Sequence, residues 1–274
     1  MPAPDWLREL LGWKQATKKS TARCIALFGE PKAPNLADVG GKESLRIAGA
    51  AYAAMGIVRE TTTTLTDSSS ENGDDTDGPV DSGSTLERGI EADIRARLAA
   101  LDDSRRWIVR REGHVANFAQ FGHLKSMQVL FDQYPELRAT LGRDYQVKTD
   151  VYVGVEHPAN PDALPFLHAA ISSKWTIRSD RVQNVRHEFA TLVRNRRGRL
   201  PHLVLVTAEP MPSRLLSIAR GTGEVDAVYH LMFDELDQAV EAVAGSEQKA
   251  AWAEMVGQRR LRSYADLAVD LTLS

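Results

Sequence analysis

Hydrophobic and polar positions follow two different patterns along this chain. In the first half, an amphipathic pattern predicts a short helix over 6–13 and an apolar stripe predicts another over 85–101. An Ala-rich helix is predicted over 43–58, and 118–141 is expected to be mostly helical. Asp5 is expected to cap the first helix, and Pro135 to interrupt the last. The clearest stripe lies in the third helix and consists of Leu86, Ile90, Ile94 and Leu98.

The second half alternates short apolar runs with helical patterns. Strands are predicted over 145–153, 167–177, 203–206 and 225–232, and helices over 180–193, 212–219 and 235–243. This alternation predicts an α/β fold, with a central mixed β-sheet flanked by helices on both faces. Residues 1–274 are expected to form a single domain. Within it, residues 61–84 are acidic and rich in Ser and Thr with almost nothing apolar, and are expected to be a mobile loop.

Charge is unevenly distributed. The net charge of −3 does not suggest a nucleic-acid partner, but eight basic residues lie between Lys174 and Arg199, opposed only by Asp180 and Glu188. This basic stretch predicts contact with a polyanion, and a solvated charged helix is the alternative. Since the chain has neither a long apolar run nor a signal-peptide pattern at its start, we expect a cytoplasmic protein with no membrane contact.

Two charged residues interrupt predicted strands. Asp150 adjoins Val151-Tyr152-Val153, and Lys174 follows Ala169 to Ser173. A charge inside an apolar strand is costly to bury unless it is paired or bound to a metal ion. An acid on one strand and a lysine on the next resemble the core of the PD-(D/E)XK nucleases, whereas an edge-strand surface lysine is the alternative.

The sequence departs from the common form of that motif. The usual second acid, two residues before the lysine on the same strand face, is Ser172 here. A metal site would then lack negative charge, and Glu188 on the following helix is the candidate to supply it.

Arg178, Asp180 and Arg181 stand at the start of that helix. Arginine pairs bidentately with guanine, and aspartate accepts a hydrogen bond from cytosine, so the three side chains could read adjacent G and C bases. A capped helix start with local ion pairs is the alternative interpretation.

A family resemblance covers residues 168–240 continuously and is thin before residue 140. It is carried by Ser172 to Arg181 with Glu188, and by residues 195–202, 206–214 and 221–230. These segments resemble the restriction endonucleases that share CCGG in their sites, and among them the NgoMIV group, whose site is GCCGGC. The resemblance implies a Mg²⁺-dependent type II enzyme that cleaves double-stranded DNA and leaves 5′-phosphates.

The resemblance also implies residue roles. Asp150, Glu188 and the main-chain carbonyl of Ser173 would hold the metal ion, and Lys174 would be the catalytic lysine. Glu87 fits a helical glutamate near the site better than Glu91. The inner CCGG would be read by Arg178, Asp180 and Arg181, and the outer pair by Arg214 with help from Asp38. The span from Asp150 to Lys174 is shorter than the family pattern, so Asp162 is the next candidate for the metal-binding aspartate.

Three functions are compatible with these patterns. A restriction endonuclease accounts for both the catalytic pair and the base-reading triplet. A non-enzymatic DNA-binding module would leave Asp150 and Lys174 unexplained, and a nuclease of repair or transposition without strict site reading would need no triplet. The expected partners are double-stranded DNA, a second copy of the chain in a homodimer or homotetramer, and a cognate methyltransferase that acts on the same site.

Overall fold

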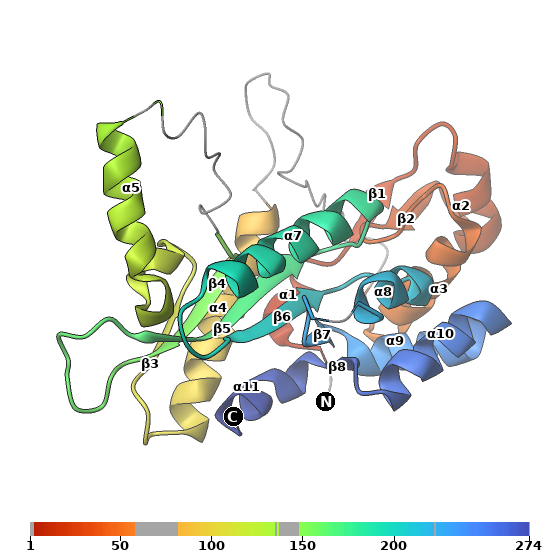
Figure 1. Ribbon diagram of the computed structural model, residues 1–274. Helices are drawn as coiled ribbons and strands as arrows, with labels where there is room; N and C mark the ends of the chain where they lie inside the picture. Colours follow the sequence, from red (N-terminus) through yellow and green to blue (C-terminus); the bar gives the residue numbers. More distant parts are fainter. Residues whose placement is uncertain (1–2, 58–81, 135, 137–147, 222, 274) are drawn as a thin grey trace.

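A six-stranded sheet forms the centre of the molecule. The computed structural model describes residues 3–57, 82–134, 136, 148–221 and 223–273. The strand order is β3-β4-β5-β6-β7-β8 (Figure 1). β3, β4 and β5 pair antiparallel, whereas β5 to β8 are parallel, so the predicted mixed sheet is confirmed. The strands span Trp107–Arg110, Val151–Val155, Phe166–Lys174, His202–Thr207, Ala227–His230 and Leu261–Ser263.

Helices cover both faces of this sheet, as predicted. Parallel neighbours need crossover connections, which are α7 (Ser179–Asn195), α8 (Pro212–Ala219), and α9 (Phe233–Val243) with α10 (Ser246–Gly257). Figure 1 shows α7 across one face and α4 (Ser82–Leu101) behind the other. α3 (Lys42–Ala54) packs along α9, and α11 (Leu267–Thr272) packs against α4.

The core lies on both sides of β5. This strand is buried from residue 167 to 173, as expected for a strand with neighbours on each side and helices on both faces. The predicted stripe Leu86, Ile90, Ile94 and Leu98 is fully buried and belongs to the same apolar cluster. A smaller cluster, which includes Cys24 and Leu45, lies beside it.

The N-terminal segment differs from the prediction. α1 spans only Asp5–Arg8, with Pro4 rather than Asp5 at the N-cap position. Trp13 begins a strand, because β1 (Trp13–Gln15) pairs antiparallel with β2 (Lys32–Pro34), beyond α2 (Thr21–Phe28). Asn35 fixes this strand pair: its N–H donates to the Gly12 carbonyl at 2.9 Å, and its side-chain oxygen accepts from the Gly12 N–H at 3.3 Å. A partner 23 residues away therefore overrides the local helical pattern.

Other elements differ from the predicted bounds by smaller amounts. The helix predicted over 118–141 begins as two short 3₁₀ turns, Val115–Asn117 and Ala119–Phe121, followed by α5 (His123–Gln133). The expected break at Pro135 and the strand start at 145–147 lie outside the described residues. So does most of the loop predicted over 61–84, although residues 82–84 form the first turn of α4. Within the described residues, no helix is long and apolar enough to cross a membrane.

Candidate active site

Asp150 and Lys174 meet at one edge of the sheet. The antiparallel register pairs Val151 with Ile171, so the residue before β4 lies beside the last residues of β5. Lys174 Nζ donates to Asp150 Oδ2 at 2.9 Å, and both side chains are about one fifth exposed (23% and 21%). Burial lowers the pKa of Lys174, but the charge and hydrogen bond of Asp150 outweigh it, so the pKa lies above its ordinary value and the ammonium is maintained.

The backbone of β5 also contacts Asp150. The Ser173 N–H donates to Asp150 Oδ2 at 2.6 Å, and the Ser172 hydroxyl lies 3.3 Å from the same oxygen. In a strand, the N–H and C=O of one residue point toward the same neighbouring strand. The Ser173 carbonyl therefore points to the side on which Asp150 lies, which is where a shared ion would sit.

Glu188 reaches this cluster from α7. Burial raises the pKa of Glu188 to about 7, Lys174 and a hydrogen bond from Ser172 oppose the rise, and the charge of Asp150 adds to it. Glu188 Oε2 is buried and has no hydrogen-bond partner among the described residues. A buried carboxylate oxygen without a partner is costly, and a cation beside it would remove that cost.

The donor set fits a hard divalent cation. Two carboxylates and a carbonyl supply only oxygen, and Mg²⁺ commonly takes one or two protein carboxylates while it keeps several water ligands. In the described part of the chain, no three Asp, Glu, His or Cys side chains converge as a complete metal-binding group. The unpartnered Glu188 oxygen beside Asp150 is therefore the observation in favour of an ion.

Glu87 and Glu91 lie in different environments on α4. The charge of Glu87 contributes to the raised pKa of Lys174, and its carboxylate lies 3.6 Å from Arg111. Glu91 pairs with Arg95 at 2.5 Å and with Arg111 at 3.3 Å. The structure thus brings Glu87 into electrostatic reach of Lys174 and engages Glu91 in ion pairs with Arg95 and Arg111.

Asp162 lies away from the cluster. It belongs to the connection between β4 and β5, and this connection leaves the sheet at the paired residues Val155 and Phe166. Lys174 is eight residues further along β5, which corresponds to roughly 25 Å at the rise of an extended strand. Asp150, and not Asp162, is the aspartate at the lysine.

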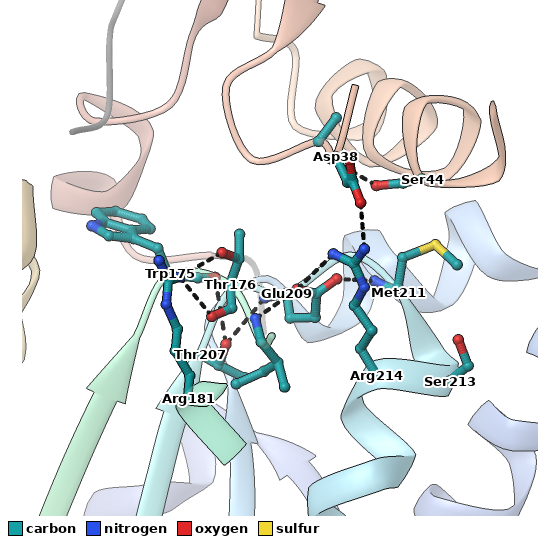
Figure 2. Close-up of polar contacts among 12 residues, drawn as sticks. Asp38, Ser44, Trp175, Thr176, Arg181, Thr207, Glu209, Met211, Ser213 and Arg214 are labelled. Carbon is teal, nitrogen blue, oxygen red and sulfur yellow. Dashed lines mark hydrogen bonds and ion pairs between the residues drawn. The ribbon is translucent and has the colours of Figure 1, made fainter. Parts of the chain in front are cut away.

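The predicted inner readers follow β5 directly. Strand β5 ends at Lys174, three residues before the predicted end, and residues 175–178 form the connection to α7. Arg178 is exposed, whereas Arg181 is only 7% exposed and donates to the Thr176 carbonyl at 3.0 Å and its hydroxyl at 2.8 Å (Figure 2). The side chain of Asp180 lies outside the described residues.

The predicted outer readers form an ion pair. Arg214 of α8 contacts Asp38, which follows β2, although 176 residues separate them (Figure 2). The hydrogen bond from Arg214 lowers the pKa of Asp38, and the charge of Arg178 acts in the same direction. Both sets of predicted base readers therefore lie at one edge of the sheet.

Sequence reasoning assigned no role to Lys14 or Glu209. Lys14 Nζ donates to the Asn35 carbonyl at 2.9 Å and holds the segment that leads to Asp38. Glu209 is fully buried between the two groups of readers. The available signal was an acid three positions after the apolar run 203–206, since an acid beside an apolar run is what singled out Asp150.

An aspartate, a lysine and a half-buried glutamate meet where an antiparallel strand pair joins a parallel sheet, and arginines lie at the start of the next helix. This combination of fold and site is that of a restriction endonuclease. The family model described as NgoMIV restriction enzyme matches residues 42–163 and 157–273. The type II restriction enzyme NgoMIV of Neisseria gonorrhoeae is 40% identical over 195 residues, which cover 61% of this chain and 68% of that protein.

The chain belongs to the NgoMIV restriction enzyme family, and it is a type II site-specific deoxyribonuclease. Enzymes of this kind generally use a divalent metal ion. Among solved structures, the restriction endonuclease PspGI in complex with substrate DNA aligns at 16% identity with a TM-score of 0.26, over 38% of this chain and 39% of that one.

Proposed function

We propose that this enzyme hydrolyses double-stranded DNA at a palindrome containing CCGG, GCCGGC being the expected site, with Mg²⁺ as cofactor and 5′-phosphates on the products. The observation that supports this most strongly is the contact of Asp150 with Lys174 beside the unpartnered Glu188 oxygen, one short connection away from Arg178.

In this mechanism, Asp150, Glu188 and the Ser173 carbonyl would hold the ion, and a bound Mg²⁺ would supply an activated water and neutralise charge on the scissile phosphate. Lys174 stays protonated because Asp150 and Glu188 face it, and it contributes a positive charge at the attacked phosphate. Glu87 adds negative potential at Lys174 from α4.

Site recognition is assigned to the side chains beyond β5 and β6. Arg178, Asp180 and Arg181 would read the inner bases, for which Arg181 exchanges its contacts with Thr176 for contacts with DNA. Arg214 and Asp38 would read the outer pair. A palindrome presents two identical half-sites, so two copies of the chain are needed, in a homodimer or homotetramer. A methyltransferase acting on the same site would protect the host DNA.

The test is digestion of a plasmid with Mg²⁺, followed by sequencing of the new ends. We expect every cut to fall within GCCGGC and every end to carry a 5′-phosphate. Lys174→Ala prepared in parallel is the control for contaminating nucleases. Cuts at unrelated sequences by the wild type would refute the proposed site, and equal cutting by Lys174→Ala would refute the proposed catalytic cluster.

A further inference from the structure

Glu209 is a buried carboxylate with two backbone partners. It follows β6 and is 0% exposed. Its Oε2 accepts from the Ile177 N–H at 2.7 Å, and its Oε1 accepts from the Met211 N–H at 2.9 Å (Figure 2). Arg214 Nη1 lies 3.9 Å from Oε2. Taking a carboxylate out of water is costly, and these charge-assisted bonds offset part of the cost: burial raises the pKa of Glu209 to about 7, while the two N–H groups and Arg214 oppose the rise.

The two backbone partners belong to the two groups of readers. Ile177 directly precedes Arg178, and Met211 is the N-cap residue of α8, which carries Arg214. Glu209 thus links the loop between β5 and α7 to the loop between β6 and α8. A second link joins them, since the Ala208 N–H donates to the Trp175 carbonyl at 3.2 Å.

From this geometry we infer that Glu209 is a positioning residue for DNA recognition: it holds the inner and outer base readers in fixed register with each other. The inference rests on the proposed function, because it assumes that Arg178 and Arg214 face bases. Glu209 itself has no exposed atom with which to contact DNA, so its effect on specificity passes through these neighbours.

The chemistry requires a carboxylate at this position. Two N–H donors converge on the group, and only a carboxylate offers an acceptor oxygen to each of them. Glutamine has the same shape but one acceptor, so its NH₂ group would face the N–H of either Ile177 or Met211 and release that connection. A glutamine would also lose the attraction to Arg214.

The experiment measures discrimination by Glu209→Gln. Single-turnover cleavage and calcium-supported binding are compared for the GCCGGC duplex and for duplexes with one inner or one outer base pair replaced. We expect the ratio of cognate to substituted DNA to fall at both positions, by roughly tenfold, which corresponds to about 1.4 kcal/mol of lost discrimination. The matched control is Glu235→Gln, which alters another buried glutamate that accepts a backbone N–H, from Ala3 at 3.0 Å.

Met211→Pro is the second variant. It removes one donor without changing Glu209, and it is expected to lower discrimination at the outer pair more than at the inner pair. It also keeps the inference testable if Glu209→Gln does not fold.

Wild-type ratios in Glu209→Gln, or a ratio lowered equally by Glu235→Gln, would overturn the inference. Uniform loss on all duplexes with discrimination retained would also overturn it. If the wild type does not cleave the GCCGGC duplex, the proposed function fails and the inference fails with it.

Discussion

Glu188 is expected to destabilise the metal-free protein at alkaline pH, and Glu188→Gln should reverse this. Burial raises the pKa of Glu188 to about 7, from 4.5 for an unperturbed glutamate. Between these two values the folded protein holds a proton that the unfolded chain has released. The free energy of unfolding therefore falls as pH rises through this interval and levels off above pH 7.

The magnitude follows from the same two values. Stability changes by about 1.4 kcal/mol per pH unit over an interval of 4.5 to about 7, which amounts to about 3 kcal/mol. A chain of this size gains roughly 2–3 °C in Tm per kcal/mol, so Glu188→Gln should melt roughly 6–9 °C above the wild type at pH 8.5. At pH 4.5 the two proteins should differ little, because the wild-type carboxyl is protonated when folded.

The assay is thermal unfolding in EDTA between pH 4.5 and 8.5, followed by the same series with Mg²⁺ or Ca²⁺. Divalent ions should raise the Tm of the wild type and have a smaller effect on the variant, since they bind the folded state through this oxygen. Glu254→Gln is the control: Glu254 pairs with Arg220 on the surface at 2.6 Å, so loss of its charge brings no gain at high pH. A difference between Glu188→Gln and wild type that does not depend on pH would refute the assignment of the buried charge.

Three further predictions concern cleavage and recognition. Lys174→Ala should abolish cleavage in Mg²⁺ but keep specific binding in Ca²⁺, measured by gel shift; cleavage at the wild-type rate would remove Lys174 from the chemistry. Glu188→Gln should strongly reduce the rate of single-turnover cleavage. Adding Ser172→Glu to this variant should restore part of the activity, because the side chains at 172 and 188 are in contact. No recovery would show that the two positions do not converge. Arg178→Ala should lose about 1–3 kcal/mol of discrimination at one C·G pair per half-site. Arg197 is one of the basic residues between Lys174 and Arg199 and is assigned to a phosphate contact, so Arg197→Ala should weaken binding to all sequences alike and lower the salt slope. Equal losses of Arg178→Ala on cognate and random DNA would contradict base reading.

Helices whose apolar residues recur at helical spacing could be predicted from the sequence. The stripe from Leu86 to Leu98 gave α4 to within three residues at its start, and α8 was predicted with the bounds that it has. In both, the residues that form the pattern are those buried in the core. The arginines at the start of α7 and the pair of Asp150 with Lys174 could also be found in the sequence, because each of these charged residues adjoins an apolar run.

Elements that depend on distant partners could not be predicted. β3 has four residues and is defined by its pairing with β4, more than 40 positions later, and no element was predicted after residue 243, where α10, β8 and α11 lie. The contact of Asp38 with Arg214 has no local signature, and its two residues were singled out only through the family resemblance. Glu209 shows the same limit, since its partners Ile177 and Met211 become visible only when two loops lie side by side.

The antiparallel pairing of β4 with β5 has a consequence for how such enzymes diverge in length. Asp150 precedes the start of β4, and Lys174 ends β5. The chain between them therefore runs along β4 to its end, turns, and returns along β5. Residues 156–165 at that turn can be shortened or extended while the two reacting side chains stay 2.9 Å apart. The two segments matched by the family model, 42–163 and 157–273, meet within this same turn. Sequence spacing and catalytic distance are thus independent quantities here, and a change in the length of this hairpin leaves the distance between Asp150 and Lys174 in place.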